Sequence, residues 1–381
     1  MSDLLVAGEP SGDRALAGVA RALGLGQLGR GGRRAFGFGG DALAAEGVEL
    51  IAHVRELGGM GVVEAAARAP SIALALARLS AHIARERPRL AVLASWSTMN
   101  ARLAAVLHRA GVIVAWISPP EIWAWRAGRA PAIARSVDLL VPTLPFEEAL
   151  WRSARGNARY VGHPVLDVPR EERPRLRARW SLPERGPLLA VLPGSRPSEI
   201  ERLLAPFVEA ARAAAIDARV LVAPSLDARS REAIARSGVP ALDAPDGAAP
   251  LLPAFDVALV ASGTAALEAA AMGVPPVIAY AMHPVSFAIA RRVVDTRKVG
   301  LPNVLLARAG QAPAFEELLQ DDVTPGALAA ALARTFADPG ARDACRAVRA
   351  ILEPVGDAPG GDSFAARAAS LVARLGGRAS R

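Results

Sequence analysis

The chain has 381 residues, which is too long for one small core, so two domains of roughly 150–200 residues each are expected. Hydrophobic residues make up 52% of the chain and charged residues 22%, which excludes a largely disordered protein. The single cysteine, Cys345, excludes an internal disulfide framework and is typical of a reducing cytoplasm.

The net charge is +8, and a basic surface favours anionic partners such as phospholipid headgroups and nucleotide diphosphates. Nucleic acid is not expected, because aromatic residues are only 4% and no dense basic stripe is interleaved with them. The apolar run at 4–7 is too short for a secretory signal. No run of about 20 uncharged apolar residues is present, so any membrane contact is expected to be peripheral.

In the first half of the chain, short apolar runs alternate with amphipathic segments. Strands are expected at residues 4–7, 90–94, 112–117, 139–142 and 158–161. Helices are expected at residues 14–23, 100–110 and 146–153. Continuous apolar strands that alternate with helices predict a parallel sheet covered on both faces.

The alternation resumes after a segment rich in charge and proline. Strands are expected at residues 188–192, 219–223, 257–261 and 276–280, and helices at 199–215, 265–272, 325–337 and 363–375. The sequence therefore predicts an α/β protein of two Rossmann-like, doubly wound parallel-sheet domains that face a central cleft. The expected divisions are an N-terminal domain at 1–168, a linker at 169–186, a C-terminal domain at 187–345 and a helical tail at 346–381.

Two glycine turns in the second half each follow a strand and precede a helix. The first contains Gly194, Ser195 and Arg196, and the second contains Ser262 and Gly263 before Thr264. Free backbone N–H groups and a helix dipole would face an anion at such turns, and an arginine can add a charge-assisted hydrogen bond. Glu268, one turn further on, is placed to bind ribose hydroxyls. One such turn is as easily an ordinary strand-to-helix connection, but two in one domain favour a diphosphate and a ribose.

The first half offers polar residues at the ends of its strands. Glu9 and Asp13 follow the first strand in a turn that lacks the GxGxxG spacing of a dinucleotide site, and they are either cleft residues or helix caps. Trp123 and Trp125 suit a sugar ring or an acyl chain, or belong to the core. His163 is either a residue of the cleft floor or a structural histidine, and no cluster of metal ligands surrounds it in the sequence.

Taken in order, these segments resemble the lipid-A-disaccharide synthases, glycosyltransferases with the GT-B fold of two Rossmann-like domains. The resemblance extends over nearly the whole chain. The segments that carry it are residues 8–13, 37–40, 58–64, 118–126, 144–147, 161–164, 192–200, 262–268 and 301–303.

The resemblance implies transfer of 2,3-diacylglucosamine from UDP to the 6-hydroxyl of 2,3-diacylglucosamine 1-phosphate, with inversion at the anomeric carbon and release of UDP. It implies no metal and no cofactor besides the UDP-sugar substrate. It also implies a cytoplasmic enzyme in peripheral contact with anionic lipids on the inner face of the inner membrane, and it leaves a homodimer open.

The resemblance further assigns residues to the substrates. The nucleotide-sugar residues would be Gly194, Ser195, Arg196, Ser262, Gly263, Thr264, Glu268 and Asn303. The catalytic residues would be Glu9 and Asp13, and the acceptor or lipid residues would be Met60, Asn100, Trp123 and Trp125.

One segment departs from the family pattern. After the strand at 90–94 the family usually carries Asp-x-Pro-Asp-Phe-Asn, whose second aspartate is a proposed general base. This chain has Ser95 and Thr98 at the two carboxylate positions and keeps Asn100. The attacking hydroxyl must lose a proton, and neither replacement accepts one at neutral pH.

Two interpretations of this departure stay open. Glu9 or Asp13 takes the proton, or the chain is a divergent paralogue with weak activity or an altered acceptor. A separate alternative function is that of a UDP-sugar 2-epimerase, which shares the two-domain architecture and the diphosphate turns but would be expected to carry more carboxylates and histidines around the cleft.

Overall fold

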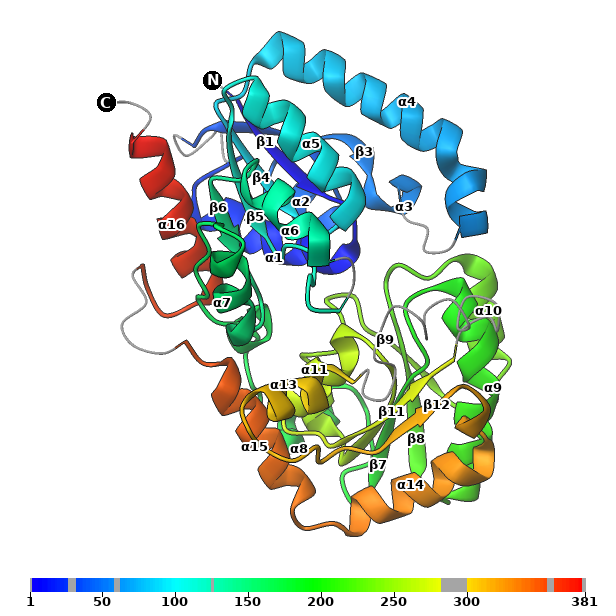
Figure 1. Ribbon diagram of the computed structural model, residues 1–381. Helices are drawn as coiled ribbons and strands as arrows, with labels where there is room; N and C mark the ends of the chain where they lie inside the picture. Colours follow the sequence, from blue (N-terminus) through cyan, green and yellow to red (C-terminus); the bar gives the residue numbers. More distant parts are fainter. Residues whose placement is uncertain are drawn as a thin grey trace. The chain divides into compact units, whose positions relative to one another are not determined.

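The computed structural model describes residues 2–26, 32–57, 62–124, 127–281, 300–354 and 360–378 (Figure 1). The chain forms two compact units, Met1–Asp167 with Pro354–Arg381, and Val168–Glu353. Each unit contains one six-stranded parallel sheet, which confirms the predicted α/β class.

The sheet of the first unit has the strand order β3-β2-β1-β4-β5-β6. Its strands are β1 (Ser2–Ala7), β2 (Arg34–Gly39), β3 (Glu49–His53), β4 (Leu90–Ala94), β5 (Ile113–Ile117) and β6 (Leu139–Val141). Its α-helices are α1 (Pro10–Ala22), α2 (Asp41–Ala45), α3 (Val54–Leu57), α4 (Val62–Glu86), α5 (Ser97–Arg109), α6 (Ala130–Ala134), α7 (Pro145–Ser153) and α16 (Phe364–Arg378). The strand expected at 158–161 is only an isolated bridge between Leu140 and Ala158.

The central part of β1 is apolar at every position because both faces of the sheet are covered. In β1, Leu4 and Val6 belong to the core on one face, whereas Leu5 and Ala7 belong to the core on the other. All four side chains are fully buried. Alternate residues of a strand point to opposite faces, so a doubly covered strand needs apolar residues at every position.

The C-terminal helix α16 completes the first unit, where it packs beside α1 (Figure 1). The Asp167 carboxylate accepts the N–H groups of Phe364, at 2.6 Å, and of Ala365, at 3.0 Å, and so caps the start of the helix. Arg367 Nε donates to the carbonyl oxygen of Val161 at 2.8 Å. The end of the chain is therefore a structural part of the unit that the beginning of the chain forms.

The sheet of the second unit has the strand order β12-β11-β10-β7-β8-β9. Its strands are β7 (Leu188–Leu192), β8 (Asp217–Val222), β9 (Ala241–Asp243), β10 (Val257–Ala261), β11 (Pro276–Tyr280) and β12 (Glu317–Leu319). The described α-helices around it are α8 (Arg173–Arg179), α9 (Pro197–Ala213), α10 (Ala228–Ala235), α11 (Thr264–Ala271), α13 (Leu301–Arg308), α14 (Pro325–Ala337) and α15 (Ala341–Leu352).

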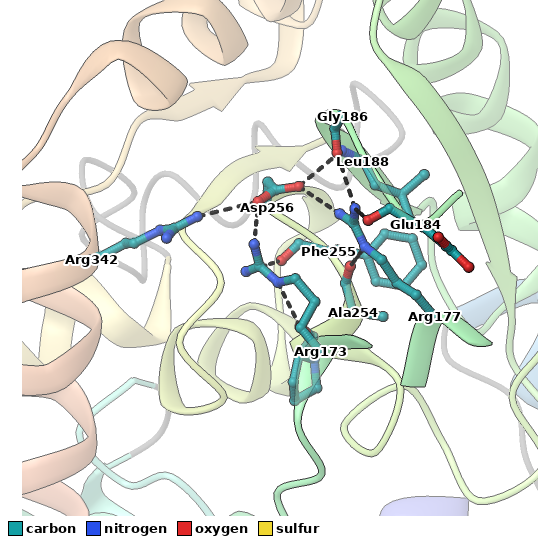
Figure 2. A network of polar contacts seen from close by, with 10 residues as sticks. Arg173, Arg177, Glu184, Gly186, Leu188, Ala254, Phe255, Asp256 and Arg342 are labelled. Atoms are coloured by element: carbon teal, nitrogen blue, oxygen red, sulfur yellow. Dashed lines mark hydrogen bonds and ion pairs between the residues drawn. The ribbon is translucent and has the colours of Figure 1, made fainter. Parts of the chain in front are cut away.

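A partly buried carboxylate joins both ends of the second unit to its sheet (Figure 2). Asp256, just before β10, accepts hydrogen bonds from Arg177 on α8 at 2.8 Å and from the Leu188 N–H on β7 at 3.0 Å. Arg173 on α8 and Arg342 on α15 bind its other oxygen. Because the Arg177 side chain is only 5% exposed, Asp256 neutralises a charge that has lost most of its water.

These contacts differ from the expected domain divisions. Residues 169–186, expected to be a linker, contain α8 and lie in the second unit. The expected tail at 346–381 is divided, since α15 belongs to the second unit and α16 to the first. A segment rich in charge and proline suggests an exposed linker, but here its arginines pair with a carboxylate at the amino end of the sheet.

Removing Asp256 should destabilise the second unit strongly, because Arg177 would stay buried without its counter-charge. We expect Asp256→Ala to lower the free energy of unfolding by about 3–5 kcal/mol in denaturant titrations. The control is Glu232→Ala, which breaks the exposed pair with Arg236 and should cost less than about 1 kcal/mol. Equal, small losses in both variants would contradict the structural role of Asp256.

Candidate functional site

The two glycine turns lie side by side in the second unit. Strands β7 and β10 are neighbours, with Leu192 opposite Val260, and the strand order runs outward in opposite directions from this pair. In open α/β sheets, ligands bind beyond the carboxyl ends of the strands at this reversal of order. Both turns follow these two strands, so the structure brings together the two segments that were predicted to bind a diphosphate.

The turn after β7 presents an arginine and a backbone N–H. Gly194 has a φ of 128°, a conformation that favours glycine. Arg196 is the N-cap residue of α9, and its side chain is 38% exposed. The Glu199 carboxylate accepts the Ser195 N–H at 2.8 Å and binds the Arg196 guanidinium at 2.8 Å. Glu199 is thus a site residue that the sequence analysis did not assign.

In the turn after β10, no described side chain lies over the glycine. Gly263 has a φ of 147° and is the N-cap residue of α11. A Cβ atom built on Gly263 meets no atom of the described structure within 4 Å. Thr264 is exposed at the first position of the helix, and Glu268 lies half-buried one turn further on. A ligand can therefore approach this backbone closely.

A tyrosine missed by the sequence analysis ends the next strand. Tyr280 closes β11, which pairs with β10 through Ala279 and Ala261. Burial and the Glu199 carboxylate raise the pKa of Tyr280, whereas Arg196 lowers it. The only signal in the sequence is its place at the end of a strand, and that signal does not identify a partner.

Asn303, expected on the donor side, has a structural position instead. The side chain is buried on α13, and its Nδ2 donates to the Phe315 carbonyl and to Glu317 at 2.8 and 2.6 Å. Its Oδ1 accepts the N–H groups of Ala314 and Phe315, both at 3.0 Å. With both donor hydrogens and the oxygen engaged inside the chain, Asn303 fixes the start of α13 rather than presenting its amide to a ligand.

The first sheet has its own reversal of strand order, between β1 and β4, where Ala7 lies opposite Ala94. The loop after β4 contains Ser95 and Trp96, both with left-handed backbone at φ 51° and 49°. A Cβ on Gly8 would lie 2.1 Å from Trp96 Cγ, so the indole rests directly on the loop after β1. Such strained non-glycine backbone is concentrated at functional sites.

Asp13, expected as a catalytic residue, caps a helix. Its buried carboxylate accepts the N–H groups of Gly40, Ala42 and Leu43 at 2.6, 3.1 and 3.3 Å. These are donors at the start of α2, which otherwise have no partner within the helix. The alternative interpretation of Asp13 as a helix cap is the one that the geometry supports.

Three glutamates occupy the carboxyl edge of the first sheet. Glu9 follows β1, Glu121 follows β5, and Glu147 lies on α7 after β6. Glu121 is within electrostatic reach of both Glu9 and Glu147. Only Glu9 was predicted from the sequence, because the order of the strands is what brings Glu121 near Glu9 and Glu147 near Glu121.

Glu147 holds the tryptophan loop. Its buried carboxylate accepts Trp123 Nε1–H at 3.0 Å and the Leu144 N–H at 3.1 Å. Burial, and then the charge of Glu121, raise the pKa of Glu147 to about 8. The Trp123 ring also packs edge-on against Phe146, with centroids 5.6 Å apart.

The other predicted residues fall into two groups. Asn100 is buried and donates to the carbonyl oxygens of Ala94 and Ser95, so it supports the loop after β4. His163 is also buried, its Nδ1 accepts the Val165 N–H at 3.0 Å, and burial lowers its pKa to about 4. Met60 and Trp125 lie outside the described residues.

Comparison with known sequences gives a consistent family. The family described as lipid-A-disaccharide synthetase matches residues 4–352. A lipid-A-disaccharide synthase of Anaeromyxobacter dehalogenans (strain 2CP-C) is 41% identical over 361 residues, which cover 92% of each chain. A lipid-A-disaccharide synthase of Klebsiella pneumoniae subsp. pneumoniae is 38% identical over 347 residues and 88% of each chain.

Solved structures share the fold at low identity. A UDP-N-acetylglucosamine 2-epimerase from Listeria monocytogenes, described as putative, matches with a TM-score of 0.63 at 12% identity, over 99% of this chain and 96% of that one. MurG of Acinetobacter baumannii matches with a TM-score of 0.54 at 13% identity, over 98% and 99%. The calicheamicin glycosyltransferase CalG4 matches with a TM-score of 0.57 at 16% identity, over 100% and 99%.

These structural matches support the GT-B fold, and the sequence matches are specific to one family over nearly the whole length. The chain therefore belongs to the lipid-A-disaccharide synthase family of glycosyltransferases.

Proposed function

We propose that the protein transfers 2,3-diacylglucosamine from UDP to the 6-hydroxyl of 2,3-diacylglucosamine 1-phosphate, releasing UDP and inverting the anomeric carbon. Membership of the family supports this reaction. The observation that best supports binding of the UDP-sugar donor is the pairing of β7 with β10, which sets the two glycine turns beside each other. The diphosphate would bind Ser195, Arg196 and the turn at Ser262, Gly263 and Thr264, and Glu268 would bind the ribose.

Arg196 supplies the positive charge in this proposed donor site. We expect Arg196→Ala to weaken UDP binding in calorimetry by about 1.5–3 kcal/mol, as is typical when a hydrogen bond to a charged group is lost. Arg334→Ala, which removes an exposed arginine on α14, should leave the affinity unchanged. A folded wild-type protein that binds no UDP would falsify the proposed function, and equal affinities in the two variants would remove only the role of Arg196.

For the proton of the attacking hydroxyl we propose Glu9 as the acceptor. Ser95 and Thr98 stand where the family has carboxylates, and Asp13 is engaged as the cap of α2. Glu9 lies at the reversal of strand order in the first sheet, where a substrate is expected to bind.

Glu9→Gln keeps the size of the side chain and removes the base. Its kcat should fall by about 10²–10⁴-fold, the usual contribution of a general base, while the affinity for UDP stays at the wild-type value. Glu121→Gln is the comparison, because Glu121 shares the same edge. Full activity in Glu9→Gln together with a large loss in Glu121→Gln would transfer the role to Glu121.

On the acceptor side, we propose that Met60, Trp123 and Trp125 contact the lipid substrate. Asn100 would support this part of the site through the loop after β4. We also propose peripheral binding to anionic lipids on the inner face of the inner membrane. No helix among the described residues is long and apolar enough to cross a bilayer. The charge of +8 and the exposed Leu74 on α4 and Val106 on α5 support attachment at the surface.

Membrane binding of this kind should depend on lipid charge. In sedimentation with vesicles, the protein should pellet with phosphatidylglycerol-containing bilayers and remain in the supernatant with pure phosphatidylcholine. Added salt should release it, because surface electrostatic attraction is screened within about 10 Å at 0.1 M ionic strength. Equal binding to both kinds of vesicle would argue against an electrostatic attachment.

Of the alternatives, the epimerase rests on fold similarity alone, at 12% identity. The divergent paralogue rests on Ser95 and Thr98. Normal turnover of the two family substrates by the purified protein would exclude both.

A further inference from the structure

The turn after β7 already holds an anion, which belongs to the chain itself. The two carboxylate oxygens of Glu199 are divided between the Ser195 N–H and the Arg196 guanidinium, each at 2.8 Å. A Cβ on Gly194 would lie 2.3 Å from Glu199 Oε2 and 2.4 Å from Glu199 Cβ. The glutamate side chain therefore lies directly on the glycine, and its carboxylate occupies the two hydrogen-bond donors that a phosphate at this turn would need.

The turn after β10 differs in this respect. A Cβ on Gly263 meets nothing within 4 Å among the described residues, so the space above this glycine is free. Among the described residues, a carboxylate covers the glycine of the β7 turn and no side chain covers the glycine of the β10 turn. A diphosphate that reaches from one turn to the other must compete with Glu199 for its hydrogen-bond donors.

The Glu199 carboxylate and a phosphate would compete for two reasons: their like charges, and the single hydrogen that the Ser195 N–H can donate. A backbone N–H has one hydrogen, and Ser195 already donates it along a short contact with Glu199. A phosphate beside the carboxylate would also place like charges next to each other, which is strongly unfavourable at close range. The Glu199 carboxylate can leave these donors by rotation of its own side chain, which is 21% exposed on the first turn of α9, whereas Cβ stays beside Gly194 because it is fixed to the helix backbone.

We propose that Glu199 is an internal stand-in for the donor phosphate: it fills the anion position of the β7 turn in the free enzyme, and the diphosphate of the nucleotide sugar displaces it. The inference rests on the proposed function, since it assumes that the ligand carries a diphosphate. Glu199 thereby lowers the affinity of the site for nucleotide and keeps Arg196 neutralised when the site is empty.

The competing explanation is that Glu199 only holds the turn in shape. A glutamate at the third position of a helix often accepts an N–H just before the helix, as Glu199 does from Ser195. The two explanations predict opposite signs. If Glu199 is displaced, removing its charge strengthens UDP binding; if it holds the turn for the phosphate, removing it weakens UDP binding.

The experiment is calorimetric titration of UDP and of uridine into the wild-type protein, Glu199→Gln and Glu199→Ala. Both substitutions should lower the Kd for UDP by at least about threefold, because a like charge leaves the site. Their affinities for uridine, which carries no phosphate, should not change. The matched control is Glu201→Gln, which removes an exposed carboxylate from the same helix and should keep the wild-type Kd.

A weakened or unchanged Kd for UDP in Glu199→Gln would overturn the inference. Glu199→Gln keeps the shape of the side chain, so it decides the question even if Glu199→Ala does not fold. Failure of the wild-type protein to bind UDP would refute the proposed function instead. Wild-type binding without a gain in Glu199→Gln would refute this inference alone.

Discussion

The proposed donor site of this protein depends on the parallel pairing of β7 with β10. The register sets Leu192 opposite Val260, so both strands end at the same edge of the sheet. The turns that follow them therefore lie next to each other. Each turn contains a glycine with positive φ, and each leads into a helix whose first N–H groups have no partner within the helix. Two neighbouring turns, two glycines with positive φ and two helix N-termini therefore lie together at this edge of the sheet.

The contacts that stabilise β7 and β10 lie at the opposite, amino ends of these strands. Asp256 lies just before β10 and pairs with arginines of α8 and α15, the first and last described α-helices of the second unit (Figure 2). This ion-pair network fixes the amino end of the strand pair, and the two glycine turns lie at its carboxyl end. The stabilising charges and the proposed ligand site are therefore at opposite ends of the same strands.

Much of this architecture could be predicted from the sequence. The apolar runs at 188–192 and 257–261 are β7 and β10 within their bounds, because a strand buried on both faces has no polar positions to blur its ends. The glycine turns were found by their place after these strands. The family could be named because several segments occur in the right order.

The roles of single polar side chains could not be predicted in the same way. Asp13 and Asn303 were both predicted to be site residues. In the structure, however, Asp13 accepts a hydrogen bond from the Gly40 N–H and Asn303 donates one to the Phe315 carbonyl, and both partners are distant in sequence. Glu147 and Glu199 were not assigned, since their importance comes from what the fold brings near them. A sequence indicates which groups are available, whereas the hydrogen-bond network decides which of them remain for a ligand.

The most direct measurement is the structure of the product formed from UDP-2,3-diacylglucosamine and 2,3-diacylglucosamine 1-phosphate by the purified protein. The account predicts one β-1,6-linked tetraacyl disaccharide 1-phosphate for each UDP released, identified by mass spectrometry and by the anomeric NMR coupling. An α-linked product, a UDP-sugar altered at C2, or UDP released without a disaccharide would contradict it.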